Sequence, residues 1–150
     1  MNIAFFLLPK SKVAYIYDDC TLRQGLEKLR HHGYTAVPVI SREGRYVGSV
    51  SEGDFLWHLV PDSKELKKHD AVSMEDIPIS LILDRNKNLP VGINSSVEDL
   101  VECTVSQNFV PVVDDQGNFI GIVTRSDVLK YYYSDTEDMI CDLSLMQRAI

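Results

Sequence analysis

The sequence has few of the residues that metal, disulfide and nucleophile sites require. Its three cysteines, Cys20, Cys103 and Cys141, are scattered with no Cys-x-x-Cys spacing. An odd and dispersed set of cysteines is more typical of a reducing compartment than of a disulfide framework. The four histidines form neither an HxxxH motif nor a Cys/His cluster. We therefore expect small buried thiols, no metal site and no cofactor.

Long hydrophobic runs are also missing. The apolar run at the N-terminus, Ile3–Leu8, has no basic segment before it and stops at Pro9 without a small-residue cleavage site. It is too short to cross a bilayer, and it does not have the pattern of a signal peptide. We expect it to pack on the domain or across a dimer seam, in a cytoplasmic protein with no membrane partner.

Positive charge is in deficit, with 15 Lys and Arg residues against 22 Asp and Glu residues and a formal net charge of −7. This balance argues against a nucleic-acid partner, and any bound anion must rely on local cations. The sequence also has no activated nucleophile, no paired acid and base, and no Gly-rich phosphate loop. We therefore expect a binding protein and not an enzyme.

What the sequence does contain is an internal repeat. The segment Val37–Leu56 aligns without a gap on Val110–Leu129, at a constant offset of 73, with eight of twenty positions identical. Among the identical pairs are Asp54 and Asp127. In each copy a strand, a Gly-containing turn, a second strand and a helix start follow one another. This repeat decides the fold prediction.

The flanking segments complete each unit. Lys12–Asp19 alternates like a short strand, and a helix capped by Thr21 then runs to a stop at Gly33. Leu89–Asn94 and a helix capped by Ser96 mirror them, with Ser96 lying 75 residues after Thr21. The second copy has therefore lost two residues between its helix and its next strand. Each unit is predicted as strand–helix–strand–strand–helix, in an α/β (α+β) fold.

The predicted organisation has four parts. Residues 1–60 hold an N-terminal segment and the first repeat, residues 61–87 a linker, residues 88–133 the second repeat and residues 134–150 a helical tail. Residues 64–69 are expected to form a solvated linker helix. The helical spacing of apolar residues in the tail favours packing or a dimer surface. These residues are Met139, Ile140, Leu143 and Met146.

The repeated pattern is apolar–Pro–Val–apolar, a turn Gly, apolar–Gly–apolar–apolar, and Ser/Thr-x-x-Asp. It resembles the tandem cystathionine-β-synthase (CBS) domain, or Bateman module, of the stand-alone bacterial type. The resemblance covers roughly Lys12 to Tyr133 and leaves no catalytic domain over. It implies two repeats packed about a pseudo-two-fold axis, clefts that bind adenosine nucleotides, and a flat homodimer.

Family geometry implies that each cleft joins the Ser/Thr-x-x-Asp corner of one repeat to the first strand and pre-proline segment of the other. In the preferred site the Asp127 carboxylate would accept hydrogen bonds from both ribose hydroxyls, and the helix start beside it would hold phosphate. Small and apolar residues would hold the adenine. The residues predicted for this site are Lys12, Val13, Ala14, Tyr34, Thr35, Ala36, Pro38, Thr124, Arg125, Ser126 and Asp127.

A second, weaker site is predicted at the symmetric position. Glu52 stands there in place of Arg125, and an acid beside a phosphate is repulsive. Asp54 has an alternative interpretation as a simple helix cap. His31 and His32, at a helix end, offer an alternative phosphate contact. The residues predicted for the second site are Ser51, Asp54, Leu89, Pro90, Asn108 and Phe109.

The predicted function is regulatory binding of AMP, ADP or ATP, which biases a hinge or dimer angle that an unidentified partner protein reads. Two alternatives stay open. The ligand of the first is cyclic di-AMP, whose 3′ oxygens are esterified and leave less for Asp127 to bind. In the second, the chain is a protein-interaction module with a vestigial cleft.

Overall fold

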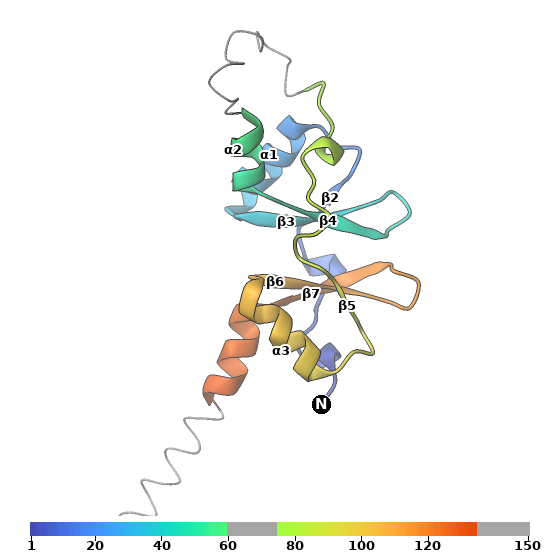
Figure 1. Ribbon diagram of the computed structural model, residues 1–150, viewed down its shortest axis with the longest axis vertical. Helices are drawn as coiled ribbons and strands as arrows, with labels where there is room; N and C mark the ends of the chain where they lie inside the picture. The colour runs from blue at the N-terminus through green and yellow to red at the C-terminus, as the bar shows by residue number, and fades with distance from the viewer. Residues whose placement is uncertain (60–74, 135–150) are drawn as a thin grey trace, which may run out of the picture.

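The computed structural model describes residues 1–59 and 75–134, and these form two similar halves stacked along the long axis (Figure 1). One half holds a three-stranded sheet of order β2-β3-β4, and the other a four-stranded sheet of order β1-β7-β6-β5. The predicted α+β fold with two repeats is confirmed. The predicted linker helix and the apolar residues of the predicted tail lie outside the described residues.

The first half follows the predicted order of elements. The predicted strand at Lys12–Asp19 is shorter than expected, because a 3-10 turn takes up Lys10–Lys12 and only two residues pair in β2. The chain begins with η1 (Ile3–Phe5) and β1 (Leu8–Pro9), which belong to the other half. The elements that follow are η2 (Lys10–Lys12), β2 (Ile16–Tyr17), α1 (Leu22–His32), β3 (Ala36–Ile40), β4 (Tyr46–Ser51) and α2 (Glu52–Leu59).

The second half repeats this order. η3 (Ile79–Leu81) precedes it in the chain and packs on the core of the first half. The elements of the second half are β5 (Val91–Gly92), α3 (Val97–Ser106), β6 (Phe109–Val113) and β7 (Phe119–Thr124), and residues 125–134 form a further helix. The hairpins share one register, since Pro38 pairs with Ser49 and Pro111 pairs with Ile122. The first strand of each hairpin also pairs in parallel with the short strand that precedes the helix of its repeat, β3 with β2 and β6 with β5.

Both helix starts are fixed by the predicted caps. The hydroxyls of Thr21 and Ser96 accept from the third helical N–H group, and the side chains of Gln24 and Asp99 return the bond in two capping boxes. The helix ends differ. Gly33 ends α1 in the left-handed conformation (φ 66°), whereas Gln107 ends α3 in an extended conformation. The two-residue deletion in the second repeat has removed the glycine cap.

The N-terminal segment crosses from the first half to the second. Leu8 pairs with Ile122 in antiparallel β1–β7, and Ile3 is fully buried in the second core. Gly121 permits this crossing, because a Cβ atom there would collide with the Leu8 carbonyl oxygen. The prediction that the N-terminal run packs on the domain is confirmed.

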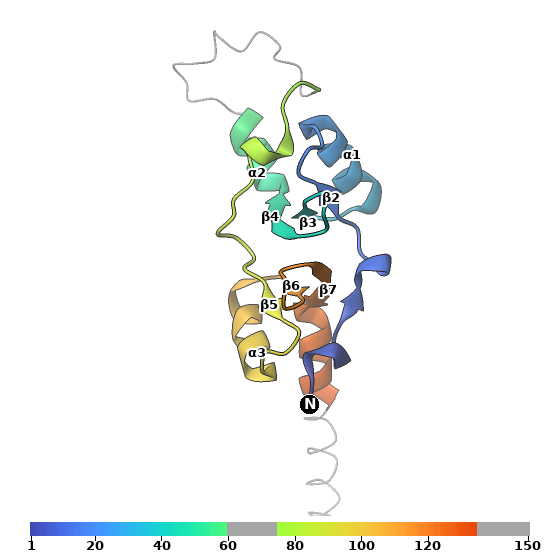
Figure 2. The ribbon, with the colours of Figure 1, turned by 90° about the vertical axis from the view of Figure 1, so that its right-hand side faces the viewer.

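The segment before β5 makes the corresponding crossing onto β4, where Ser49 bridges to Asp84. The two sheets therefore face each other, with helices on their outer sides (Figure 2). At the centre the ring of Tyr46 stacks on that of Phe119, its counterpart at the repeat offset, with ring centroids 6.2 Å apart. Reciprocal bonds join the hairpin turns, from Tyr46 N to the Gly117 oxygen and from Phe119 N to the Gly44 oxygen. These contacts mark a pseudo-two-fold axis.

Candidate functional site

A cleft of about 250 Å³ lies between the two halves. Eight residues predicted for the preferred site line it: Lys12, Val13, Ala14, Tyr34, Thr35, Ala36, Pro38 and Thr124. Four further residues complete the lining: Leu8, Asn108, Phe109 and Ile122. Leu8 and Ile122 were missed because the crossing of β1 onto β7, which brings them there, has no strong sequence signal.

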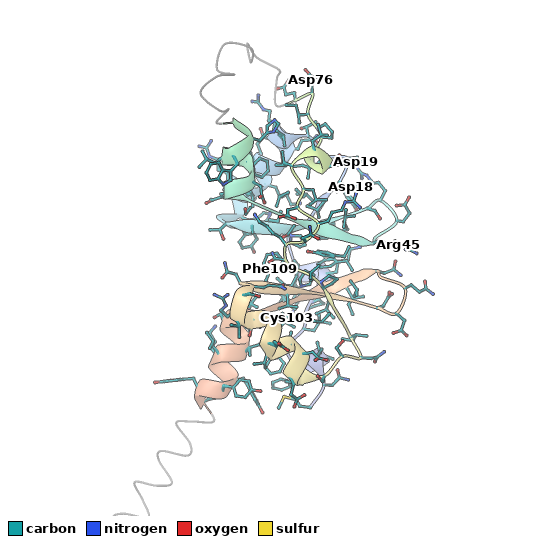
Figure 3. The ribbon with its side chains drawn as sticks, viewed as in Figure 1. Asp18, Asp19, Arg45, Asp76, Cys103 and Phe109 are labelled. Atoms are coloured by element: carbon teal, nitrogen blue, oxygen red, sulfur yellow. The ribbon has the colours of Figure 1, made fainter. Side chains whose placement is uncertain are left out.

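One wall of this cleft is apolar and suits a flat base. Phe109 is buried, and Figure 3 shows it at the level where the two halves meet. Val13, Ala14 and Ala36 contribute small side chains from the other half. Pockets of this kind, apolar with a few convergent polar groups, are typical of small-molecule sites.

The polar end of the cleft is at Thr124 and Lys12. The Thr124 hydroxyl accepts a hydrogen bond from Asp127 N at 3.1 Å and caps the helix of residues 125–134. Lys12 is exposed, and none of the described carboxylates forms an ion pair with it. The cleft therefore offers one helix N-terminus and one unpaired ammonium to an anionic group.

The Asp127 carboxylate is available for a ligand. Its side chain is 47% exposed, and the nearest described cation is the Lys130 ammonium, 3.9 Å from Oδ1. Asp54 differs: its Oδ2 accepts from Ser51 N at 2.8 Å and from the Ser51 hydroxyl at 3.0 Å. The cap interpretation of Asp54 is thus supported, and the interpretation of Asp127 as a ligand residue stays a prediction.

Arg125 points to the end of α3. Its Nε donates to the Thr104 oxygen at 2.7 Å, and its Nη2 donates to the Val105 oxygen at 3.5 Å. A guanidinium there satisfies carbonyl groups that α3 leaves open at its C-terminus, where the last turn has no basic residue of its own. The predicted phosphate contact of Arg125 therefore requires the loss of these bonds.

A second cavity, of about 680 Å³, adjoins the cleft through Asn108, which lines both. Arg125 and the predicted Ser126 line this cavity and not the cleft. Lys130 also lines it. Lys130 was missed because it follows the repeated motif by three positions, outside the pattern that identified the site.

The predicted second site is divided. Asn108 and Phe109 face the first cleft, whereas Ser51 and Asp54 lie with the segment that precedes β5. Lys87 of that segment donates to Asp54 Oδ1 at 2.8 Å. Burial alone would raise the pKa of the Asp54 carboxyl, yet hydrogen bonds from Lys87 and Ser51 hold this pKa below its ordinary value. Leu89 accepts a bond through its carbonyl from Gln107, and Pro90 is exposed.

His31, His32 and Cys103 do not line the cleft. The ring of His32 stacks on that of Tyr34, and His31 lines a separate groove with Tyr15 and Tyr17. Burial, then the neighbouring acids, raises the pKa of the Cys103 thiol, which disfavours a nucleophilic thiolate. Among residues 1–59 and 75–134, no cluster of His, Cys, Asp and Glu is arranged to hold a metal ion.

The helices in the described part of the chain are all too short or too polar to cross a membrane.

A family model described as the CBS domain matches residues 7–61 and 80–134. Cyclic di-AMP receptor B of Bacillus subtilis is 27% identical over 131 residues, which cover 86% of this chain and 84% of that protein. CbpB of Listeria monocytogenes, solved in complex with c-di-AMP, has a TM-score of 0.76 and 26% identity, covering 90% of this chain and 97% of that chain. CBSX2 of Arabidopsis thaliana, solved in complex with AMP, has a TM-score of 0.71 and 26% identity, covering 90% and 98%.

Proposed function

The chain belongs to the CBS domain family, and we propose that it is a regulatory protein that binds an adenosine nucleotide in the cleft between its two repeats. The observation that carries this proposal is the convergence of an apolar slot and the Thr124 helix start in one cleft, with the Asp127 carboxylate one turn along that helix. Relatives of similar size that bind c-di-AMP or AMP support it.

A mononucleotide fits the polar groups best. A ribose with free 2′ and 3′ hydroxyls needs one carboxylate with unused acceptors, and Asp127 has them. The phosphate would extend past Asn108 toward the larger cavity, where the Lys130 side chain supplies positive charge. AMP, ADP and ATP are therefore the first candidates.

Cyclic di-AMP is the second candidate. The cleft and the adjoining cavity share Asn108, so one ligand with two bases has room to span both. One of the relatives named above is a cyclic di-AMP receptor and another was solved in complex with c-di-AMP, which strengthens this alternative. Its esterified 3′ oxygens would leave the Asp127 carboxylate with fewer donors.

Isothermal titration calorimetry with AMP, ATP, cyclic di-AMP and GTP tests the proposal. A ligand at a hundredfold excess over its dissociation constant adds about 2.7 kcal/mol of stability, so a thermal shift provides an independent readout. We expect an adenine nucleotide to bind and GTP to fail. Failure of every adenine nucleotide would leave the protein-interaction module as the better interpretation.

Signalling would pass through a homodimer, as the family resemblance implies. Helix α2 and the helix of residues 125–134 lie along the left edge of the view in Figure 1. They expose Leu56 and its repeat counterpart Leu129, together with Trp57, which follows Leu56 and is 79% exposed. Such anchors are typical of interface cores. Sedimentation equilibrium should show a dimer, and Trp57→Asp should shift it to monomer; a monomeric parent protein would refute this surface.

A further inference from the structure

The two halves carry the same lysine–aspartate pair. Lys87 lies 75 residues after Lys12, the same offset that separates the helix caps Ser96 and Thr21. Asp127 lies 73 residues after Asp54, the offset of the repeated hairpins. Each lysine precedes the first strand of its own repeat, and each aspartate belongs to the helix start of the other repeat. The pseudo-two-fold axis therefore relates the two pairs.

The two pairs are in different states. Lys87 Nζ lies 2.8 Å from Asp54 Oδ1, and the Asp54 side chain is only 11% exposed. Since Ser51 occupies Oδ2, both carboxylate oxygens already accept hydrogen bonds. Lys12, which lines the first cleft, forms no ion pair with any described carboxylate. Asp127 is not among the residues that line that cleft; it lies beside it, three residues after Thr124, and is half exposed.

Residues beneath the lysines explain the difference. The Tyr46 hydroxyl donates to the Asn88 carbonyl at 2.7 Å, and the Asn88 side-chain amide donates to the Ser49 hydroxyl at 2.9 Å. Asn88 also adopts a positive φ of 50°, which asparagine tolerates better than most residues. These bonds hold the segment on β4 and place Lys87 over Asp54.

The other half lacks every one of these anchors. The counterparts of Tyr46, Ser49 and Asn88 at the repeat offsets are Phe119, Ile122 and Val13. None of these side chains has a donor or acceptor. Lys12 is therefore not fixed over Asp127. This sequence difference accounts for an ion pair between the repeat-related lysine and aspartate at Asp54 and for its absence at Asp127, whose described ion-pair partner is Lys130.

We propose that Lys87 blocks the second predicted site, at Asp54, and so restricts nucleoside binding to the first cleft. This inference rests on the proposed function and adds a residue that sets its stoichiometry. A ribose diol needs the two acceptors of one carboxylate, and at Asp54 it must displace a charge-assisted hydrogen bond. At Asp127 it displaces nothing comparable.

Lys87→Met tests the proposal with adenosine as the probe. Adenosine carries the diol without a phosphate, so Glu52 does not repel it. Calorimetry of the parent protein should show one adenosine bound per chain. K87M should show a second binding event, because the affinity at Asp54 should rise by about tenfold or more over that of the parent protein at the same site. The first event serves as an internal check that K87M is folded. Lys87→Gln, which keeps an uncharged N–H donor group, should give a weaker second event.

The matched control is Arg85→Met, which removes an exposed cation from the same segment and should leave one event. Adding Asp54→Ala to K87M should abolish the gained event. A parent protein that binds two adenosines equally, or a K87M variant that gains nothing, overturns the proposal. If the parent protein binds no nucleoside while K87M gains a site that depends on Asp54, the proposed first cleft is wrong and the role of Lys87 stands.

Discussion

The two repeat-related aspartates should respond in opposite ways to the same substitution. Asp127→Asn removes the charge of a half-exposed carboxylate. Among the described residues its ion-pair partner is Lys130, whose ammonium lies 3.9 Å from Oδ1. An exposed pair of this kind is worth about 0–1 kcal/mol, so the free energy of unfolding should hardly change. Binding should suffer instead, because a charge-assisted hydrogen bond contributes about 1.5–3 kcal/mol, or roughly ten- to hundredfold in affinity for AMP.

Asp54→Asn should show the reverse. The change removes the negative charge to which Lys87 Nζ, Ser51 N and the Ser51 hydroxyl all donate. It also replaces one of the two acceptor oxygens by an NH₂ group, which faces one of these donors. We expect a loss of about 2 kcal/mol in unfolding free energy, which corresponds to about 4–8 °C in Tm for a chain of this size. AMP affinity at the first cleft should stay within about twofold.

Urea unfolding and AMP calorimetry on both variants separate these effects. If Asp54→Asn weakens AMP binding more than Asp127→Asn does, the choice of cleft is wrong. If Asp127→Asn destabilises the protein by as much as Asp54→Asn, then the Asp127 carboxylate has a structural partner and is not available for a ribose. A further test uses 2′-deoxy-AMP, which should bind the parent protein about as poorly as AMP binds Asp127→Asn.

Two further predictions concern stability. The pKa of Asp54 is lowered in the folded protein, so its contribution to the free energy of unfolding is complete above the unfolded pKa of about 4 and is lost as the pH falls through the folded pKa. Urea titrations below about pH 4 should therefore show a steeper loss of stability with falling pH for the parent protein than for Asp54→Asn. Equal slopes would contradict this role of Asp54. Gly121→Ala should lower the Tm well below that of its counterpart Gly48→Ala. The added Cβ collides with the Leu8 carbonyl oxygen at Gly121, whereas at Gly48 it meets the movable Leu83 side chain at 3.0 Å and the Asp84 carbonyl oxygen at only 3.3 Å.

The fold was predictable because its strongest determinant is a repeat in the sequence. The caps at Thr21 and Ser96, the Gly33 stop and the hairpin register each follow from local residue chemistry. The crossing of β1 onto β7 was not predictable, because a strand of two residues, one of them a proline, gives no periodicity. Its only sequence trace is Gly121, a small residue inside a strand.

The candidate site was predictable where it depends on backbone placement and less so where it depends on side-chain direction. The residues from Lys12 to Ala14 and from Tyr34 to Ala36 meet in one cleft, as the repeat geometry implies. Arg125 has the expected backbone position, but its side chain turns to α3. The reason is the deletion before Asn108, which leaves the C-terminus of α3 without a glycine cap and makes its carbonyls strong acceptors for a nearby cation.

The engagement of Arg125 makes Lys12 and Lys130 the cations that a phosphate would meet in and beside the first cleft. Both side chains are exposed, so their removal should cost little stability. Lys12→Met and Lys130→Met should each weaken AMP binding by about threefold to tenfold at low salt, because a partly screened charge at this range contributes about 1 kcal/mol. Adenosine binding should be unchanged, since adenosine carries no phosphate. The opposite result is that Arg125→Met weakens the binding of AMP more than that of adenosine, while neither lysine variant does. In that case Arg125 leaves α3 when the ligand binds and contacts the phosphate itself.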